Sequence, residues 1–197
     1  LGRVISLLEK LDNPHLKIPS AIHIAGTNGK GSTLSFLKAG LEADRKIVHS
    51  YTSPHLVDFT ERINLSGKKI EETLLHKYLQ TCEKINQENN ITFFEVTTCA
   101  AFLAFSDYNA DYTLLEVGLG GRLDATNVIE QPRLSIITPI SLDHQQFLGD
   151  TILEIAEEKA GILKPQVPAI VGRQTHEVEE KICSIAKTLN VPVRLFG

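Results

Sequence analysis

The sequence has no long apolar run, no internal repeat and no low-complexity tract in its 197 residues. A transmembrane helix needs about 18 to 20 consecutive apolar residues, so we expect no membrane-spanning segment. The chain starts at Leu1 without a charged and then apolar leader, which predicts no secretory signal. Apolar residues make up 42% and charged residues 22%, which excludes the disordered, collagen-like and coiled-coil classes.

Cysteine and excess positive charge are also scarce. The chain contains only Cys82, Cys99 and Cys183, with no CxxC pair and no histidine at zinc-ligand spacing. A scattered, odd set of this kind predicts reduced thiols, a cytoplasmic protein and three cysteines that serve as packing residues. The net charge is −4 with acids and bases well mixed, so nucleic acid is not expected as a main partner.

Short apolar runs alternate with helix-period stretches along the chain. The runs are rich in Ile, Val and Leu, as expected for strands that are covered on both faces. The expected strands are 21–25, 46–50, 112–117, 134–138, 168–172 and 191–196. The expected helices are 31–43, 71–88, 95–108, 151–160 and 175–189. This alternation predicts an α/β fold with a mostly parallel sheet, helices on both faces and ligands at the carboxyl ends of the strands.

A glycine-rich turn, GTNGKGST (26–33), connects the first expected strand to an apolar helix. Glycines let backbone N–H groups approach phosphate oxygens, and the helix N-terminus and Lys30 add positive charge. The spacing departs from GxxxxGK[ST] because Gly31 separates Lys30 from Ser32, so another group must supply a hydroxyl to magnesium. The alternative is an ordinary turn with a solvated lysine.

Three further strand ends carry polar residues. Ser53 precedes a proline, which favours an extended backbone and lets its hydroxyl point towards a neighbouring loop; an ordinary turn serine is the alternative. Glu116 lies in an apolar strand, where a magnesium ligand is found in phosphate-loop enzymes, or it forms an ion pair with Arg122. The pair Asp143 and His144 follows the fourth strand, and an imidazole there can take a metal position.

One lysine shares the apolar face of its expected helix. The helix opens with the capping box of Thr151 and Glu154, and Lys159 lies on the same face as Ile152 and Ile155. A buried cation near Lys30 is unfavourable, so one interpretation is that burial neutralises the amine and carbon dioxide then converts it to a carbamate. The other is that the stem lies along the core while the amine reaches solvent.

Six motifs resemble one known family in the same order. They are GTNGKGS (26–32), YTSPHL (51–56), FTERI (59–63), LLEVGLGGRLDATN (114–127), ISLDH (140–144) and EKAGILK (158–164). Together they resemble the folylpolyglutamate synthase and dihydrofolate synthase family, a branch of the Mur-ligase superfamily. The resemblance implies an ATP-dependent ligase of folate biosynthesis that joins L-glutamate to dihydropteroate or to a reduced folate through an acyl phosphate.

The resemblance also implies roles for individual residues. Lys30, His144 and Lys159 would be catalytic. The ATP phosphates would be bound by Thr27, Asn28, Gly29, Lys30, Gly31 and Ser32. Magnesium would be held by Ser53, Glu116, His144 and Lys159 as its carbamate. The pterin site would include Thr92, Leu123, Asp124 and Ala125.

Residues 1–197 would then form the P-loop ATPase domain of a monomeric enzyme whose members are about twice this length. The C-terminal glutamate ligase domain is absent from this chain, so we expect the chain alone to ligate nothing. Two other interpretations stay open, namely another Mur-type amide ligase and a non-catalytic ATP-binding module.

Overall fold

The computed structural model describes residues 1–87 and 89–196. In this part of the chain a single sheet has the order β4 (Lys68–Lys69), β3 (Ile63–Leu65), β2 (Val48–Tyr51), β5 (Tyr112–Glu116), β1 (Ser20–Ala25), β6 (Leu134–Ile137), β7 (Ala169–Gly172) and β8 (Val193–Phe196). The strands from β2 to β8 in this order pair in parallel, whereas β3 and β4 add an antiparallel hairpin at one edge.

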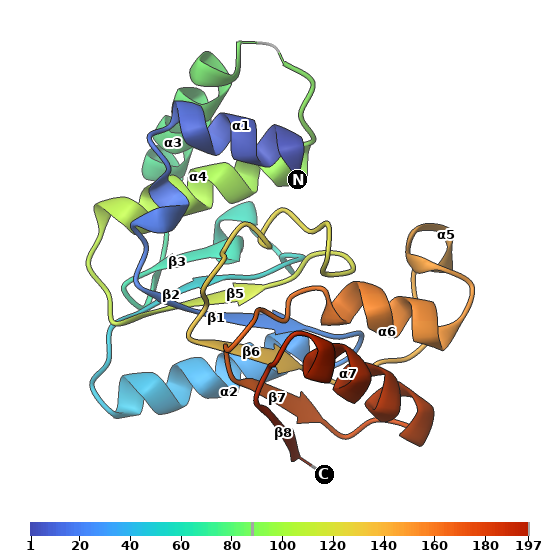
Figure 1. Cartoon of the computed structure of the whole chain (residues 1–197). Coiled ribbons are helices and arrows are strands. Elements are labelled where there is room, and N and C mark those ends of the chain that lie inside the picture. The colour runs from blue at the N-terminus through green and yellow to red at the C-terminus, as the bar shows by residue number, and fades with distance from the viewer. Residues whose placement is uncertain (88, 197) are drawn as a thin grey trace.

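Helices connect the strands, as Figure 1 shows. The α-helices are α1 (Gly2–Lys10), α2 (Lys30–Ala43), α3 (Glu72–Asn86), α4 (Phe93–Asp107), α5 (Gln145–Leu148), α6 (Ile152–Ala160) and α7 (His176–Thr188). Two 3-10 turns, η1 (Pro14–Leu16) and η2 (Phe59–Arg62), complete the elements described. Among the described residues, no helix combines the length and the apolar character that crossing a bilayer requires.

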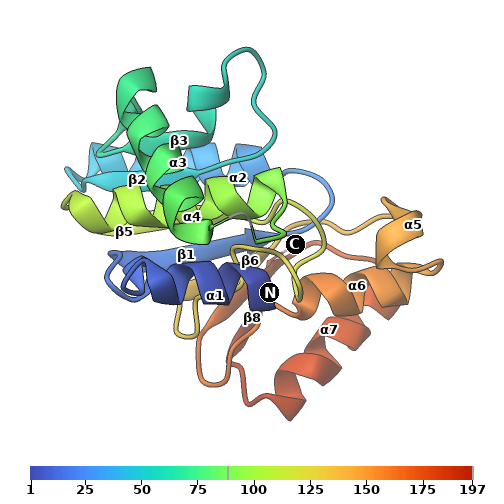
Figure 2. The ribbon, with the colours of Figure 1, turned by 90° about the horizontal axis from the view of Figure 1, so that it is seen from above.

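The two faces of the sheet are covered unequally. Along β1, Ala21 packs in the core beneath α1, α3 and α4, and Ala25 packs in the core beneath α6 and α7. Ile22 and Ile24 point to the opposite face, where they pack against α2. Figures 1 and 2 show α2 on the far side of the sheet from α1 and α4. The predicted fold class, a mostly parallel sheet with helices on both faces, is confirmed.

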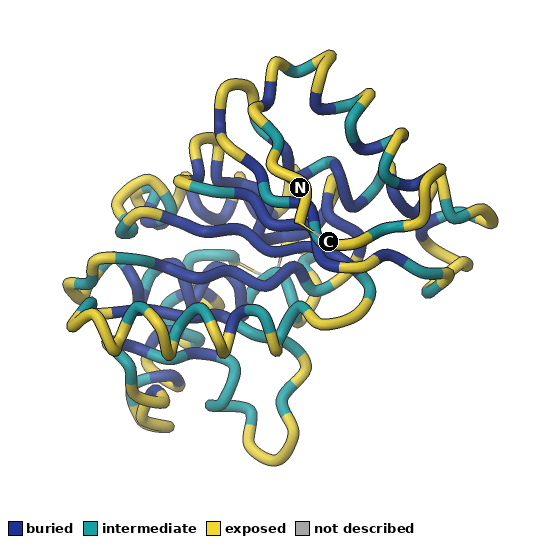
Figure 3. The backbone as a smooth tube through the Cα atoms, turned by 90° about the horizontal axis from the view of Figure 1, so that it is seen from below, coloured by how far each residue is buried: buried dark blue, intermediate teal, exposed yellow. Residues whose placement is uncertain are grey.

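The central strands are buried on both sides, as the dark tube in Figure 3 shows. Strands β2, β5, β1 and β6 are consecutive neighbours in the sheet and run parallel. The four loops singled out in the sequence follow these four strands, so they leave the sheet along one edge. The topology therefore gathers the candidate site residues.

The structure differs from the sequence prediction at several elements. Helix α1 was not predicted, although Val4, Leu7 and Leu8 follow a helical period and are buried. The β3–β4 hairpin was also missed because its strands are short; its turn has positive φ at both Ser66 and Gly67, as a tight hairpin requires. Helix α4 begins two residues earlier than predicted, at a capping box, and α5 was not predicted. Residue 88, the predicted end of one helix, lies outside the described residues.

The cysteine prediction is confirmed for two of the three residues. Cys82 and Cys99 are fully buried in the core that α1, α3 and α4 share, and their thiols are free. Cys183 is also free but only half-buried. Burial raises the pKa of the Cys82 thiol to about 12, so this group stays protonated near neutral pH and acts as a small apolar side chain.

One buried hydroxyl in the sheet gives a stability prediction. Thr113 on β5 is fully buried, and its Oγ1 has no hydrogen-bond partner among the described residues. A valine has nearly the same shape and removes the unpaired hydroxyl. We expect Thr113→Val to raise the free energy of unfolding by about 1 kcal/mol, measured by urea denaturation. A loss of stability of that size would show that the hydroxyl has a partner in solution.

Candidate functional site

The phosphate loop joins β1 to α2. Gly26 has φ 147°, and a Cβ there would overlap the hydroxyl of Thr138 on the neighbouring loop. Gly29 has φ 82°, in the left-handed region, and directly precedes α2. Helix α2 has no side-chain cap and no acidic residue in its first turn. Its first N–H groups and its dipole therefore present partial positive charge to an anion.

The loop after β6 braces the phosphate loop. The backbone N–H groups of Thr27 and Asn28 both donate to Pro139 O, at 3.0 and 3.1 Å. Thr27 Oγ1 donates to Ser141 O at 3.1 Å, and Asn28 Nδ2 donates to Ser141 Oγ at 3.1 Å. Both residues were predicted to bind phosphate, but in this structure their donors hold two loops together. Phosphate binding by these two residues stays a prediction, as it does for Gly29, Lys30, Gly31 and Ser32.

Two lysines converge on one carbonyl oxygen. Lys30 Nζ lies 3.1 Å from Gly26 O and 3.3 Å from Thr27 O, and Lys159 Nζ lies 3.0 Å from Gly26 O. Lys159 is only 3% exposed, so its amine does not reach solvent. The interpretation in which this side chain extends to water is therefore wrong. Its position on the apolar face of α6 carries its amine to the phosphate loop.

The charge of Lys159 is easily lost. Burial is the main cause that lowers its pKa from 10.5 to about 8, and the nearby charge of Lys30 lowers it further, while Asp143 and Asp124 oppose the shift. A larger share of the amine is therefore neutral near pH 8 than for an ordinary lysine. A neutral amine is the form that reacts with carbon dioxide.

A small cavity of about 20 Å³ lies at this point. It is lined by Lys30, Asp143, His144, Lys159 and residues 117–120. That volume has room for roughly one water-sized particle. His144 is half-exposed, has φ 49° and places Nε2 3.5 Å from Asp143 Oδ2. The structure thus brings the three predicted catalytic residues to one cavity.

Glu116 and Ser53 lie beside this cavity without lining it. Glu116 ends β5 and is 5% exposed, and the N–H of Ser53 donates to its Oε2 at 3.3 Å. Burial raises the pKa of Glu116, while this hydrogen bond and the charge of Lys30 lower it. The ion pair with Arg122 is wrong as an alternative, because Arg122 pairs with Glu158 at 2.6 Å. A buried carboxylate with so few donors fits a bound cation.

Across the described residues, no group of three or more His, Cys, Asp and Glu side chains is arranged to hold a metal ion. The predicted magnesium set contains only two side chains of these types, Glu116 and His144. The other two ligands would be a serine hydroxyl and a modified lysine. The magnesium site therefore stays a prediction.

A groove of about 250 Å³ contains all four residues predicted for the pterin site. Its lining includes Thr92, Leu123, Asp124 and Ala125. The side-chain lining that sequence reasoning missed consists of Arg3, Phe94, Glu95, Leu119, Phe147, Leu148 and Glu158. The groove and the small cavity share Leu119 and Gly120. An acid bound in the groove would thus lie next to the lysine pair.

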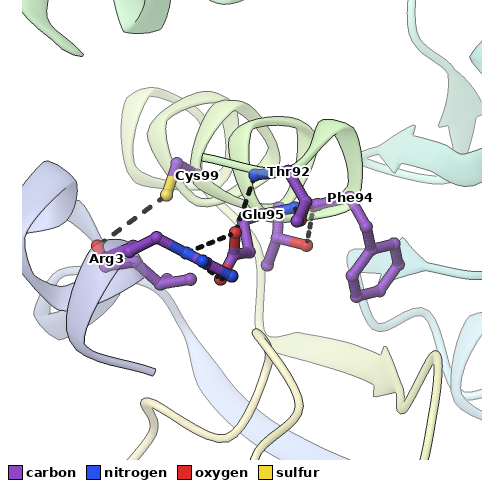
Figure 4. A network of polar contacts seen from close by, with 7 residues as sticks. Arg3, Thr92, Phe94, Glu95 and Cys99 are labelled. Carbon is purple, nitrogen blue, oxygen red and sulfur yellow. Dashed lines mark hydrogen bonds and ion pairs between the residues drawn. The ribbon is translucent and has the colours of Figure 1, made fainter. Parts of the chain in front are cut away.

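Figure 4 shows the polar contacts of Arg3, Thr92 and Glu95, which are among the residues that line this groove. Thr92 and Glu95 form a capping box at the start of α4, with Thr92 N donating to Glu95 Oε2 at 2.7 Å. Arg3 on α1 donates to the same carboxylate through Nε and Nη2, at 3.1 and 3.0 Å. The capping-box pattern is readable from sequence. The contact with Arg3 joins residues 92 positions apart, which no local pattern shows.

A larger hollow, of about 710 Å³, lies between η2, β4 and α3. Its lining includes Asp58, Lys69 and His76, but none of the predicted site residues. Lys69 pairs with Asp58 at 3.1 Å, so its charge is already compensated. Size alone therefore does not make this hollow the functional site.

Residues 24–197 match the family model described as the Mur ligase middle domain. The chain belongs to this family. It is 42% identical over 179 residues to a dihydrofolate synthase/folylpolyglutamate synthase of Bacillus subtilis. That match covers 87% of this chain and 41% of the relative. The matched range of the family model begins in β1, directly before the phosphate loop.

Solved folylpolyglutamate synthase structures share the fold. The Mycobacterium tuberculosis enzyme complexed with ADP has a TM-score of 0.90 and 37% identity, covering 98% of this chain and 46% of that one. A complex of such an enzyme with AMPPCP and folate has a TM-score of 0.92 and 34% identity, covering 98% and 48%. The chain thus spans less than half the length of these relatives.

Proposed function

We propose that this chain is the ATP-binding part of a longer ATP-dependent ligase. The ligase would join L-glutamate to dihydropteroate, to the glutamate tail of a reduced folate, or to both, through an acyl phosphate. One observation carries the proposal: the phosphate loop with its two lysines shares Leu119 and Gly120 with the groove that contains all four predicted pterin residues. The reacting carboxylate and the terminal phosphate can therefore meet.

The relatives support this assignment by what they bind. The mycobacterial structure contains ADP, and the second contains AMPPCP and folate. Because the chain spans less than half of each, we propose that a glutamate ligase domain follows residues 1–197 in the whole protein. We also infer a monomeric, cytoplasmic enzyme, consistent with the free buried thiols of Cys82 and Cys99.

The chemistry begins with phosphoryl transfer, which needs alignment and charge neutralisation more than covalent help. The ATP phosphates would be bound by the phosphate loop and the first turn of α2, namely Thr27, Asn28, Gly29, Lys30, Gly31 and Ser32. An oxygen of the pterin acid carboxylate attacks the γ-phosphorus, the bond to the β-γ bridging oxygen breaks, and ADP leaves. The amine of glutamate then attacks the acyl carbon, phosphate departs, and the amine loses a proton to complete the amide.

Ser53, Glu116, His144 and Lys159 would hold magnesium, which when bound neutralises charge on the transferred phosphate. Lys159 would first add carbon dioxide: its neutral nitrogen forms a bond to the carbon and releases one proton. The amine then becomes an anionic carbamate. This change removes the repulsion between Lys159 and Lys30 and supplies oxygen ligands of the kind magnesium prefers.

Phosphate release by the whole protein tests the proposal. Dihydropteroate and tetrahydrofolate are offered separately, each with ATP, magnesium and glutamate, and omission of glutamate is the control. We expect glutamate-dependent release with at least one acid. Release that is indifferent to both acids would instead support another Mur-type ligase, and ATP binding without turnover would support a non-catalytic module. Glutamate-dependent ADP release from residues 1–197 alone would contradict the proposed second domain.

Glu116 allows a separate test of the metal site. We expect Glu116→Gln to raise the magnesium concentration needed for half-maximal activity about tenfold, because a neutral amide is a weaker ligand than a carboxylate. Activity is measured across a magnesium titration at saturating ATP. Glu157→Gln is the matched control, since Glu157 pairs with Lys181 at 2.8 Å and lines neither the groove nor the small cavity. An unchanged requirement in Glu116→Gln would exclude this carboxylate as a ligand.

A further inference from the structure

A buried hydrogen-bonded chain links the centre of the sheet to the loop of residues 118–127. His23 Nε2 on β1 lies 2.8 Å from Thr126 Oγ1, which lies 2.5 Å from Asp124 Oδ1. His23 and Thr126 are fully buried, and Asp124 is 6% exposed. Three polar side chains buried side by side in a core lower the stability of the fold unless each of their protons is shared in a defined hydrogen bond.

The protons of this chain can be assigned from its contacts. Asp124 accepts N–H groups from Gly118 and Leu119 at Oδ2, both at 3.0 Å, and from Thr126 at Oδ1, at 2.9 Å. Burial raises the pKa of Asp124 above its usual range, and these bonds only partly oppose the shift. Because both of its oxygens receive donors, the geometry makes Asp124 the acceptor. The Thr126 hydroxyl therefore donates to Asp124 and must accept from His23 Nε2–H.

His23 is thereby fixed in one form. Burial, and secondarily the charge of Lys164, lower its pKa to about 3, so the imidazole is neutral near pH 7. Its Nε2 carries the proton, and its Nδ1 has no partner among the described residues. An unpaired nitrogen in the core is unfavourable to stability. An apolar residue in this place would leave no unpaired nitrogen in the core. We therefore look for the role of His23 in the hydrogen bond that it makes with Thr126.

The held residue, Asp124, shapes the loop that lines both parts of the site. Its N–H donors, Gly118 and Leu119, line the small cavity with Lys159, and Leu119 also lines the groove. All four of its hydrogen-bonding positions are occupied within the protein. Its carboxylate therefore orders the loop in which Asp124 itself lines the groove.

The same loop lies against the end of α6. Arg122 N donates to Glu158 O at 2.8 Å, and Asn127 Nδ2 donates to Gly161 O at 3.0 Å. A Cβ on Gly121 would lie 2.7 Å from Glu158 O, so the two backbones meet without room for a side chain. A shift of the loop would therefore change both the shape of the groove and the position of Lys159.

We propose that His23 and Thr126 are positioning residues that hold Asp124, and through it residues 118–125, in the shape that the pterin acid requires. This inference rests on the proposed function for the identity of the ligand. The phosphate loop is held separately by hydrogen bonds to Pro139 and Ser141. We therefore expect nucleotide binding not to depend on the hydrogen bonds between His23, Thr126 and Asp124.

Binding measurements on the whole protein test the inference without turnover. We expect Thr126→Val to raise the Kd for dihydropteroate about tenfold in the presence of ADP, and to leave the Kd for ADP within about twofold. Thr126→Ser, which retains the hydroxyl, should bind dihydropteroate within about threefold of the unmodified protein. The matched control is Thr113→Val, a buried substitution of the same kind outside the loop, with both Kd values unchanged.

Histidine-selective ¹⁵N labelling gives a readout that general destabilisation would not produce. The His23 signal, identified by its loss in His23→Gln, should show a protonated Nε2 and an unprotonated Nδ1 from pH 5 to 8. A proton on Nδ1, titration in that range, equal losses in Thr126→Ser and Thr126→Val, or parallel losses of ADP binding would overturn the inference. Correct binding ratios without ligation would contradict only the proposed function.

Discussion

Replacing Lys30 with glutamine is expected to lower the turnover number of the whole ligase about a thousandfold. Lys30 directly follows Gly29, and its amine lies 3.1 Å from Gly26 O, inside the loop where the phosphates would bind. Charge on the transferred phosphate group must be neutralised in the transition state, and glutamine keeps the length of the side chain without the charge. The measurement is glutamate-dependent phosphate release at saturating substrates.

Lys84→Gln on α3 is the matched control, because it makes the same chemical change at an exposed position away from the phosphate loop. The melting temperatures of both variants should stay within a few degrees of the unmodified protein. A turnover number for Lys30→Gln within tenfold of the control would contradict the role of Lys30. Equal losses in both variants would indicate a general effect of charge on the preparation.

Most of the fold was readable because local signals and topology agree. Strands β1, β2, β5, β6 and β7 follow short apolar runs, and the alternation with helices predicts parallel pairing. The missed elements are those whose signals are short or long-range. The β3–β4 hairpin has strands of only three and two residues. Helix α1 begins without a side-chain cap, and it packs over α4 through the long-range burial of Val4, Leu7 and Leu8.

The candidate site was predictable to the extent that it lies at strand ends. Residues that follow neighbouring parallel strands must meet at one edge of the sheet, and this brings Glu116 near Lys30 and Ser53. The periodicity of α6 placed Lys159 on an apolar face but could not decide between burial and extension to solvent. That choice depends on Gly26 O, which lies 133 positions away in the sequence. Hydrogen-bond partners of this kind follow only from the tertiary structure.

We expect removal of the buried amine of Lys159 to raise the stability of the fold and to abolish ligase activity. A lysine whose folded pKa is about 8, against a usual 10.5, binds its proton more weakly in the folded state. At any pH where Lys159 is protonated in the unfolded chain, its burial therefore lowers the free energy of unfolding. This loss of stability is complete below pH 8. As pH rises from 8 to about 10.5 the loss disappears, so stability increases with pH over this window.

We expect Lys159→Met to unfold with a free energy about 3 kcal/mol higher than the unmodified protein at pH 7, because the variant buries no charge. The same substitution should remove ligase activity, since methionine can form neither a cation nor a carbamate. Denaturation is measured at pH 7 and pH 10 in metal-free buffer without carbon dioxide. The gap in unfolding free energy between the variant and the unmodified protein should narrow at the higher pH. Lys164→Met, on a half-buried lysine with a smaller pKa shift, is the control. A gap that is independent of pH would show that shape rather than charge sets the difference, and retained ligation would exclude Lys159 from the reaction.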